Sequence, residues 1–311
     1  MKRILITGQN SYIGNSFADY LEREYPGEYE ISRVSLRENA GWEPSLQETP
    51  RQETPLQETP RQETPWQETS WAGVDTVLHV AGIAHVDTKT VDQEGEARYY
   101  AVNRDLTIRA ASKAKADGVK QFIFLSSMIV YGKAGRIGDN TPLQPLNFYS
   151  DSKRQAEEGL QALSDDGFAV AILRPPFVYG KGSKGNYPLL AALAVKTPLF
   201  PSIDTKHSMI FVGNLCEFLR LLTESGKGGT YHPQNAEIIS TAELVKEIAA
   251  VHGRKVHLTG LFNPILRVLM PRLGLVTKVF GEFVYTQELS RYEDMPYQRY
   301  SLEESIRLTE L

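Results

Sequence analysis

The chain has 311 residues, of which 41% are hydrophobic and 23% are charged, and its formal net charge is −4. This composition is typical of a globular protein, and the length allows a main domain with a smaller lobe. The slightly acidic charge argues against a nucleic-acid-binding surface, which would be strongly basic. The single cysteine, Cys216, excludes an intramolecular disulfide and is expected to be buried in an apolar helix.

The N-terminus begins directly with a strand pattern and has neither the apolar region nor the cleavage site of a signal peptide. No stretch of about 18 uncharged apolar residues is present, so we expect no transmembrane segment. A cytoplasmic location is the expectation that follows from these features and from the lone cysteine.

Up to residue 174, short apolar strands alternate with helical patterns. The expected strands lie at residues 3–7, 30–36, 76–80, 121–125 and 169–173. The expected helices lie at residues 13–24, 99–117 and 149–163, followed later by 214–224 and 240–251. This alternation predicts an α/β fold, a Rossmann-type doubly wound parallel sheet with helices on both faces.

Residues 46–70 interrupt this order with five copies of a pentapeptide, LQETP RQETP LQETP RQETP WQETS. A proline at every fifth residue prevents a regular helix or a central strand, and no periodic apolar face is available for burial. We expect a disordered or polyproline-like insert at about residues 43–70. A proline-rich docking site is the alternative.

Residues 261–285 combine Leu, Val and Phe with Arg267, Arg272 and Lys278. One interpretation is a helical core of a C-terminal lobe. The alternative is a peripheral contact with a membrane surface, because basic and apolar residues alternate there.

The turn after the first strand has the form that binds a dinucleotide diphosphate. Residues 7–14 read TGQNSYIG, in which Gly8 permits a tight turn and Gly14 lets the helix pack close to the strand. Ser11 replaces the usual middle glycine, and an ordinary strand-to-helix turn is the alternative. The residues expected to bind the cofactor here are Gly8, Asn10, Ser11, Tyr12, Ile13 and Gly14.

The second strand ends at Ser35, where an acidic residue usually binds the adenosine ribose. Arg37 lies nearby, so a 2′-phosphate and NADP are favoured, although solvated arginines explain the pattern equally well. The cofactor is therefore expected to be NAD or NADP. After the third strand, the small residues Ala81 and Gly82 permit close approach of a cofactor, whereas His79 is expected to be a packed core residue.

Two further residues complete the expected cofactor contacts. Asn103 begins the run NRDLT on the next helix, and Pro176 follows the fifth strand. Taken alone, Asn103 would be an exposed polar residue. No metal site is expected.

Tyr149 and Lys153 form a Y-x-x-x-K pattern on a predicted helix, so the phenol and the ammonium project from one face. An ammonium and a positive nicotinamide ring would favour the phenolate, which lets tyrosine act as a base. Ser127 leaves the end of the fourth strand, where open α/β sheets place their chemistry, and its hydroxyl can share the proton moved by Tyr149.

Four motifs occur in a characteristic order: TGxxSxIG at the start, SSMIVYG, YSDSK, and LRPPFVYGKG at residues 173–182. The sequence resembles the extended short-chain dehydrogenases/reductases, the NAD-dependent epimerase/dehydratase family, over roughly residues 1–41 and 72–260. The resemblance implies Tyr149 as the acid/base, Lys153 as its orienter and ribose ligand, and Ser127 as the proton relay. It implies hydride transfer between C4 of a nucleotide sugar and the nicotinamide.

The family's 4,6-dehydratases carry Asp-Glu after the catalytic hydroxyl residue, whereas Met128 and Ile129 follow Ser127 here, so dehydration is not expected. Asn186 resembles an asparagine that meets the nucleotide diphosphate, and His207 stands where relatives often have a phosphate-binding arginine. Lys206 or Arg299 would supply the missing charge, and solvated polar residues are the alternative for each.

The resemblance implies an NAD(P)-binding domain at residues 1–174 with about 207–234, and a smaller mixed α/β substrate lobe at residues 175–206 and 235–311. The first hypothesis is a sugar-nucleotide 4-epimerase acting on a UDP-hexose or UDP-N-acetylhexosamine in surface-polysaccharide synthesis. A 4-keto-sugar-nucleotide reductase using NADPH is the alternative, and a non-catalytic NADP-binding regulator is the hypothesis of another class. The oligomeric state stays open, with a homodimer as one alternative.

Overall fold

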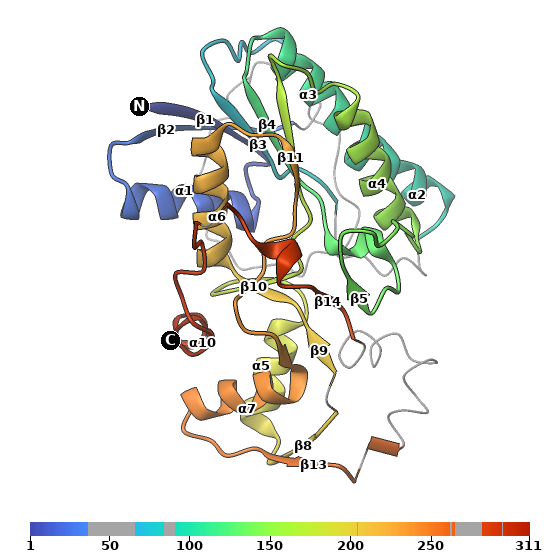
Figure 1. Cartoon of the computed structure of the whole chain (residues 1–311), viewed down its shortest axis with the longest axis vertical. Helices are drawn as coiled ribbons and strands as arrows, with labels where there is room; N and C mark the ends of the chain where they lie inside the picture. Colours follow the sequence, from blue (N-terminus) through green and yellow to red (C-terminus); the bar gives the residue numbers. More distant parts are fainter. Residues whose placement is uncertain (37–65, 84–90, 204, 262, 265–281, 294) are drawn as a thin grey trace, which may run out of the picture.

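A six-stranded parallel sheet with the strand order β11-β6-β4-β3-β1-β2 forms the centre of the computed structural model (Figure 1). The structure describes residues 1–36, 66–83, 91–203, 205–261, 263–264, 282–293 and 295–311. The strands of the sheet are β1 (Lys2–Thr7), β2 (Tyr29–Val34), β3 (Thr76–His79), β4 (Gln121–Leu125), β6 (Ala169–Leu173) and β11 (Gly229–Tyr231). The predicted Rossmann-type sheet is confirmed.

Helices cover both faces of this sheet because the apolar strands are buried on both sides. One face is covered by α1 (Tyr12–Glu24) and α6 (Val212–Ser225), whose side chains pack with Ile4 and Ile6 of β1. The other face is covered by α3 (Thr107–Ala116) and α4 (Phe148–Gln161), with α2 (Gln93–Tyr100) packed on α4 (Figure 1).

The helix predicted at residues 99–117 begins earlier and is interrupted. Asp92 accepts a hydrogen bond from the Gly95 N–H at 2.9 Å, and this cap starts α2 at Gln93. A π-helical turn, η1 (Ala101–Leu106), separates α2 from α3. The segment around Asp92 has few apolar residues, so hydrophobic periodicity alone did not detect its helix.

The C-terminal lobe has its own hydrophobic core, which includes Tyr179, Phe200 and Val245. Its helices are α5 (Tyr187–Lys196), α7 (Thr241–Val251) and α10 (Leu302–Glu310). Its short strands are β7 (Phe177–Tyr179), β8 (Leu199–Pro201), β9 (Lys206–His207), β10 (Met209–Phe211), β12 (Ile239–Ser240) and β13 (His257–Thr259). Ser240 and Glu243 form a reciprocal capping box at the start of α7, as their spacing predicts.

The segment after residue 282 returns to the main domain before it reaches α10. The strand β14 (Val284–Tyr285) pairs with β5 (Arg136–Ile137), which follows the 3-10 turn η2 (Met128–Tyr131). After the second 3-10 turn, η3 (Glu288–Ser290), Tyr292 and Tyr297 pack in the core beneath α6. Tyr292 and Tyr297, which lie in the segment assigned from the sequence to the substrate lobe, therefore pack in the main domain.

The last unit of the pentapeptide repeat is packed, which corrects the expectation of an unstructured insert at that end. Trp66 is 3% exposed, and its ring centroid lies 6.0 Å from that of buried Trp71. The Trp71 N–H donates to the Asp117 carboxylate at 2.7 Å. A tryptophan occupies the position that holds Leu or Arg in the other copies, so this unit alone supplies an aromatic side chain. Residues 43–65 lie outside the described residues.

In the described part of the chain, every helix is too short or too polar to cross a membrane. Most of residues 261–285, including Arg267, Arg272 and Lys278, lie outside the described residues, so neither interpretation of that segment is tested.

Candidate active site

The turn after β1 lies at the carboxyl edge of the sheet, next to the end of β3. Gly8 has a φ of +87°, and a Cβ placed on it would lie 2.9 Å from the backbone nitrogen of Ala81. A Cβ on Gly14 would lie 2.9 Å from Cγ2 of Ile6, so α1 approaches β1 as closely as glycine allows. Backbone conformation thus requires glycine at Gly8, and close packing of α1 on β1 favours it at Gly14. The contact of either residue with a cofactor stays a prediction.

Ser11 is the N-cap of α1, which explains how the helix starts without the usual middle glycine. Its hydroxyl accepts the Gly14 N–H at 3.3 Å, and its own N–H donates to the Gly8 carbonyl at 2.8 Å. The first turn of α1 carries no acidic side chain, so its positive dipole end suits an anion. The turn therefore fits a dinucleotide diphosphate. The other predicted contacts belong to the same turn: Asn10, Tyr12 and Ile13.

Ser35 directly follows β2, beside the glycine turn. The Gly8 N–H donates to the Val34 carbonyl at 3.2 Å, which joins the ends of β1 and β2. Ser35 thus lies at the edge where an adenosine ribose is bound in dinucleotide-binding sheets. Arg37 lies outside the described residues, so its predicted contact with a 2′-phosphate is untested.

The ends of β3 and β4 bring Lys153 and Ser127 to the same edge. Lys153 is 6% exposed, and its Nζ donates to the Leu125 carbonyl at 3.1 Å. A Cβ on Gly82 would lie 3.3 Å from that Nζ, so the ammonium lies between the two strand ends. Ser127, two residues beyond Leu125, is the N-cap of η2, and its hydroxyl accepts the Ile129 N–H at 3.3 Å.

Tyr149 lies in the first turn of α4, one helical turn before Lys153, so both side chains project from the same side of the helix. Its ring centroid lies 6.1 Å from that of Tyr99, which packs against Phe148 at 4.8 Å. Asn147 caps α4 in a reciprocal box with the third residue of the helix. Aromatic packing and the cap together hold the phenol at this end of α4.

The protein alone does not activate the phenol. Burial raises the pKa of Tyr149 to about 12, and Tyr99 adds a smaller effect in the same direction. Burial also lowers the pKa of Lys153 to about 8, although Glu157 partly opposes this change. The expectation that the ammonium and a positively charged nicotinamide ring together favour the phenolate stays a prediction.

A buried ion pair supports the active-site edge from beneath. Glu157 is 1% exposed, and Arg174 donates to its carboxylate at 2.6 and 3.2 Å. The Ser126 hydroxyl also donates to Glu157, one residue before Ser127. Arg174 donates to the Tyr131 hydroxyl at 2.7 Å, so the pair fixes both ends of η2. Sequence reasoning missed this pair, although Glu157 lies one helical turn after Lys153.

Asn103 is fully buried in the π-helical turn and bonds to protein groups. Its Oδ1 accepts the Ile83 N–H at 2.8 Å, and its Nδ2 donates to the Ile83 carbonyl at 3.1 Å and to the Ser152 hydroxyl at 3.2 Å. Its side chain thus ties the loop after β3 to α4 and positions Lys153 beside Gly82. The expected direct contact with a cofactor is not favoured by this burial.

Two residues have the structural roles expected for them. His79 is 1% exposed between the hydroxyls of Thr7 and Thr107, each at 2.9 Å, and burial lowers the pKa of His79 to about 3. Cys216 is 1% exposed, and burial raises the pKa of its thiol, so the thiolate nucleophile is disfavoured.

The predicted substrate contacts are spread over the lobe. Asn186 is half-buried at the start of α5, where its side chain makes no capping hydrogen bond. His207 is half-buried in β9 and forms a β-bridge with Phe283, which precedes β14. Pro176 is buried after β6, and the neighbouring Pro175 carbonyl accepts the Met128 N–H at 3.0 Å. The expected contacts of Asn186 and His207 with substrate, and of Pro176 with the cofactor, therefore stay predictions.

Arg299 lies elsewhere, on the outer side of α1 and α6. Its guanidinium donates to the Tyr20 hydroxyl at 3.2 Å, lies 3.4 Å from the Glu217 carboxylate, and faces the Tyr25 ring at 5.6 Å. These contacts do not support the expected role of Arg299 in substrate binding, which stays a prediction. The alternative cation, Lys206, pairs with Glu243 at 2.9 Å.

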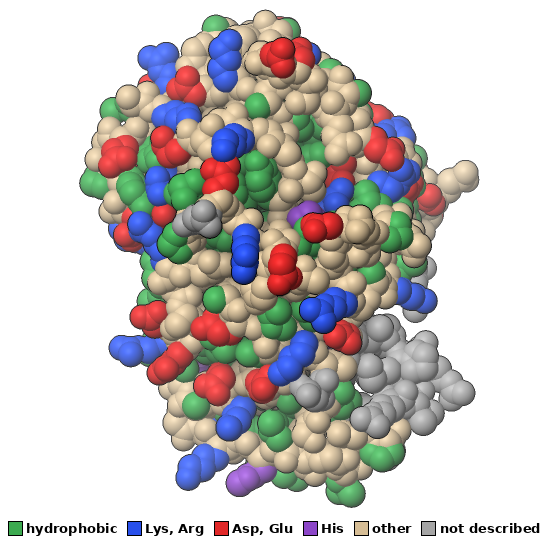
Figure 2. All heavy atoms as spheres, in the orientation of Figure 1, with side chains coloured by type: hydrophobic (Ala, Val, Ile, Leu, Met, Phe, Trp, Pro, Cys, Tyr) green, Lys and Arg blue, Asp and Glu red, His purple; other side chains and the backbone are tan. Residues whose placement is uncertain are grey.

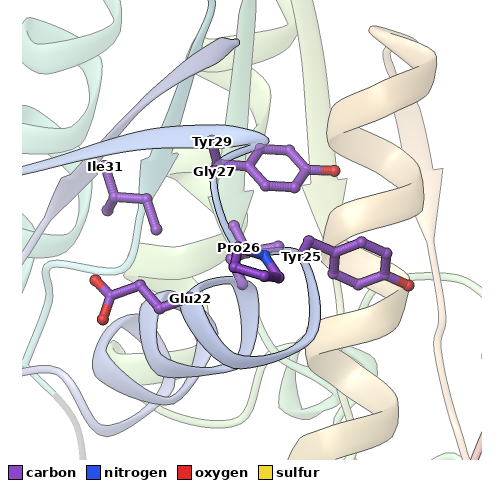
Figure 3. Close-up of a pocket in the computed structure, with 7 residues that line it drawn as sticks. Glu22, Tyr25, Pro26, Gly27, Tyr29 and Ile31 are labelled. Atoms are coloured by element: carbon purple, nitrogen blue, oxygen red, sulfur yellow. The ribbon is translucent and has the colours of Figure 1, made fainter.

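A small cavity of about 150 Å³ lies at the opposite edge of the sheet, between the end of α1 and the start of β2 (Figure 3). Its lining includes Glu22, Tyr25, Pro26 and Tyr29. In parallel α/β sheets the chemistry lies at the carboxyl edge, so this cavity is not part of the candidate active site. Among the described residues, no cluster of His, Cys, Asp or Glu could hold a metal ion.

Comparisons with known proteins identify the family of the chain. The sequence pattern of the NAD dependent epimerase/dehydratase family matches residues 4–232. A UDP-glucose 4-epimerase of Vibrio cholerae is 36% identical over 56% of this chain and 56% of its own length. An N-acetyl-alpha-D-glucosaminyl-diphospho-ditrans,octacis-undecaprenol 4-epimerase of Escherichia coli O157:H7 is 32% identical over 68% of this chain and 65% of its own. The matched region thus spans less than two thirds of either relative.

Solved structures share the fold at low sequence identity. The human epimerase family protein SDR39U1 with NADPH has a TM-score of 0.70 and 16% identity, and the alignment covers 99% of both chains. A dTDP-4-dehydrorhamnose reductase of Clostridium acetobutylicum has a TM-score of 0.60 and 18% identity over 83% of this chain and 82% of its own.

Proposed function

Because the chain belongs to the NAD dependent epimerase/dehydratase family, we propose that it transfers hydride at C4 of a nucleotide-activated sugar. The 4-epimerase reaction is the form that we favour, with a UDP-hexose or UDP-N-acetylhexosamine as substrate. The observation that carries the proposal is the position of the Lys153 ammonium between the ends of β3 and β4, one helical turn from Tyr149 and near Ser127.

In this mechanism, a bound NAD would supply the two-electron chemistry, as acceptor and then donor of the hydride of sugar C4. Tyr149 removes the proton of the C4 hydroxyl, and Ser127 shares that proton through its hydroxyl. Lys153 would hold the nicotinamide ribose and keep a positive charge near the phenol. Rotation of the 4-keto sugar before the hydride and the proton return inverts C4, so no net oxidation occurs.

The residues after Ser127 support epimerisation or reduction over dehydration. Met128 is 3% exposed and Ile129 is partly buried, and neither can act as the acid or base that removal of water across C5 and C6 requires. The names of the Vibrio cholerae and Escherichia coli relatives support C4 as the reacting carbon. The second of these relatives acts on a polyprenyl-linked sugar, so we include a lipid-linked sugar among the substrates to be tested.

The test is incubation of the purified protein with UDP-N-acetylglucosamine and, separately, UDP-glucose, without added cofactor. A 4-epimerase converts either sugar to its C4 epimer with NAD that co-purifies with the protein. The Y149F variant, which lacks only the phenolic hydroxyl, should lose conversion and keep the bound cofactor. Absence of conversion by the wild-type protein with every sugar tested would contradict the epimerase proposal.

An NADPH-dependent 4-keto-sugar reductase is the second candidate, because Ser35 replaces the usual acidic residue. It predicts NADPH oxidation with a 4-keto sugar nucleotide and no epimerisation. A non-catalytic NADP-binding regulator predicts cofactor binding without turnover in either assay. A cytoplasmic location and a homodimer remain proposals that fractionation of cells and measurement of the solution mass would test.

A further inference from the structure

His232 is a buried titratable residue that the proposed mechanism does not use. It directly follows β11, and Arg174 directly follows β6, the neighbouring strand of the sheet. The Arg174 N–H donates to the Tyr231 carbonyl at 2.9 Å, which joins these two strand ends. Ser126 and Ser127 follow β4, on the other side of β6. His232 therefore lies at the carboxyl edge that carries the candidate active site.

A chain of hydrogen bonds connects His232 to the turn that begins after Ser127. The Tyr131 hydroxyl lies 2.8 Å from Nε2 of His232 and accepts a hydrogen bond from Arg174 at 2.7 Å, and Arg174 also donates to Glu157. Charged side chains of both signs are spread over the surface in Figure 2, whereas this chain is buried: Glu157, Tyr131, His232 and Arg174 are 1%, 4%, 7% and 8% exposed. A buried polar group without a partner costs free energy, so each member needs its neighbour.

The chemistry of these groups fixes the direction of each hydrogen bond. Arginine has only donors, so the Tyr131 oxygen accepts from Arg174. In the part of the chain that the structure describes, the Tyr131 hydroxyl bonds only to Arg174 and His232, so its own proton is directed to Nε2 of His232. Nε2 is then unprotonated, and Nδ1 carries the proton of the ring. Burial lowers the pKa of His232 to about 3, and Arg174 adds to this shift, in agreement with a neutral ring.

Tyr285 of β14 packs against this chain. Its fully buried ring lies edge-on to the rings of Tyr131 and His232, with centroids 6.2 and 5.0 Å apart. Its hydroxyl donates to the Arg174 carbonyl at 2.7 Å. Packing and hydrogen bonds together hold the Tyr131 side chain in one direction. Because Tyr131 ends η2 and Ser127 caps its start, the position of this side chain bears on the whole turn.

We propose that His232 is a positioning residue for Ser127. By accepting the proton of Tyr131, His232 fixes one end of the four-residue turn η2, and the Ser127 hydroxyl caps the other end by accepting the Ile129 N–H at 3.3 Å. Groups that transfer protons work only within a narrow range of positions, which hydrogen bonds behind them maintain. The proposal rests on the proposed function, in which Ser127 shares the proton that Tyr149 removes.

The first test does not depend on the reaction. Nitrogen NMR of the protein with isotopically labelled histidine distinguishes the two neutral tautomers from the cation, and H232Q identifies the His232 signals by their loss. At a pH of about 7 we expect Nδ1 to be protonated and Nε2 to be unprotonated, and we expect Y131F to shift the Nε2 signal. A ring protonated on Nε2, or a cation at this pH, would overturn the proposal.

The second test measures epimerisation and separates kcat from KM. H232L leaves the Tyr131 proton without an acceptor, so kcat should fall about tenfold with little change in KM, as part of the 10²–10⁴-fold that a proton-transferring group contributes. H232Q should recover most of this loss, because its amide oxygen can accept the same proton. Y131F should lower kcat as H232L does. Its matched control is Y292F, since Tyr292 is also 4% exposed and donates to the Ser225 hydroxyl at 2.8 Å, away from η2.

The S127A background shows whether His232 acts through Ser127. There, H232L should lower kcat no further, because the group that it positions is absent. Equal losses in the wild-type and S127A backgrounds, or an H232Q variant as impaired as H232L, would mean that His232 only supports the fold and would overturn the proposal. If the wild-type protein converts no sugar nucleotide, the proposed function fails, while the expected tautomer still supports the bond from Tyr131 to His232. The two failures are therefore distinguishable.

Discussion

The carboxyl edge of the sheet and the C-terminal segment from residue 282 onward differ in how their residues are brought together. At the edge, each side chain directly follows a strand or lies in the first turns of a helix, as Ser127 and Tyr149 do. In the C-terminal segment, contacts with elements distant in the sequence decide where a side chain lies, as those of Arg299 with Tyr20 and Glu217 show. Position along the chain, next to a strand end or a helix start, therefore predicts where side chains lie in the first region but not in the second.

The largest expected effect comes from the centre of the first region. Y149F removes the hydroxyl that carries the proton, so we expect kcat to fall about 10²–10⁴-fold. Thermal stability should change little, because the Tyr149 hydroxyl forms no hydrogen bond with the part of the chain that the structure describes. Conversion of the sugar nucleotide and the unfolding midpoint are measured on the same sample. Retention of full turnover would remove Tyr149 from the chemistry.

Glu157→Gln tests whether the buried pair beneath the edge affects both stability and chemistry. Removal of one charge leaves Arg174 buried without its carboxylate, so we expect a loss of about 3–5 kcal/mol in the free energy of unfolding. Burial already lowers the pKa of Lys153 to about 8, and Glu157 opposes that shift. Protonated Lys153 is lost as the pH rises through this pKa, and E157Q should move this alkaline loss of kcat/KM to lower pH.

A double variant separates the two effects of Glu157. E157Q/R174M removes both charges, so we expect it to recover part of the stability that E157Q loses, because no unpaired charge is buried. The alkaline loss of kcat/KM should stay at the lower pH, since the charge near Lys153 is still absent. A pH profile that returns to that of the wild-type protein in the double variant would show that Glu157 acts through the fold alone.

The sequence predicted most of the sheet domain because its signals are local. The strands at residues 121–125 and 169–173 were predicted with their observed bounds. Glycine is required at Gly8 by its positive φ and favoured at Gly14 by close packing against β1. The ion pair of Glu157 with Arg174 joins residues from α4 and the end of β6, and periodicity carries no information on such contacts. Nor could motif spacing show that Arg299 would meet Glu217 instead of a substrate.

Trp66→Ala tests the packing of the last unit of the repeat. Trp66 is 3% exposed and packs against Trp71 near Leu5 and Leu36, so truncation should lower the free energy of unfolding by about 3–5 kcal/mol. Chemical denaturation measures this loss. Gln67→Ala in the same unit is the control, because Gln67 is exposed. Equal small effects for both variants would show that the repeat does not contribute to the core.

Arg299→Gln has the smallest expected effect. It tests most directly whether the C-terminal segment is separate from the site at the carboxyl edge of the sheet. Arg299 is partly exposed, and Glu217 keeps its bond to Arg220 at 2.8 Å, so we expect a loss of at most about 1 kcal/mol in stability. The KM for the sugar nucleotide should not change, because the guanidinium faces Tyr20 and Tyr25 on the outer side of α1. H207Q is the comparison: if His207 meets the substrate phosphate, it should raise KM without a matching loss of stability. A raised KM in R299Q would instead mean that the C-terminal segment rearranges to bring Arg299 to the substrate.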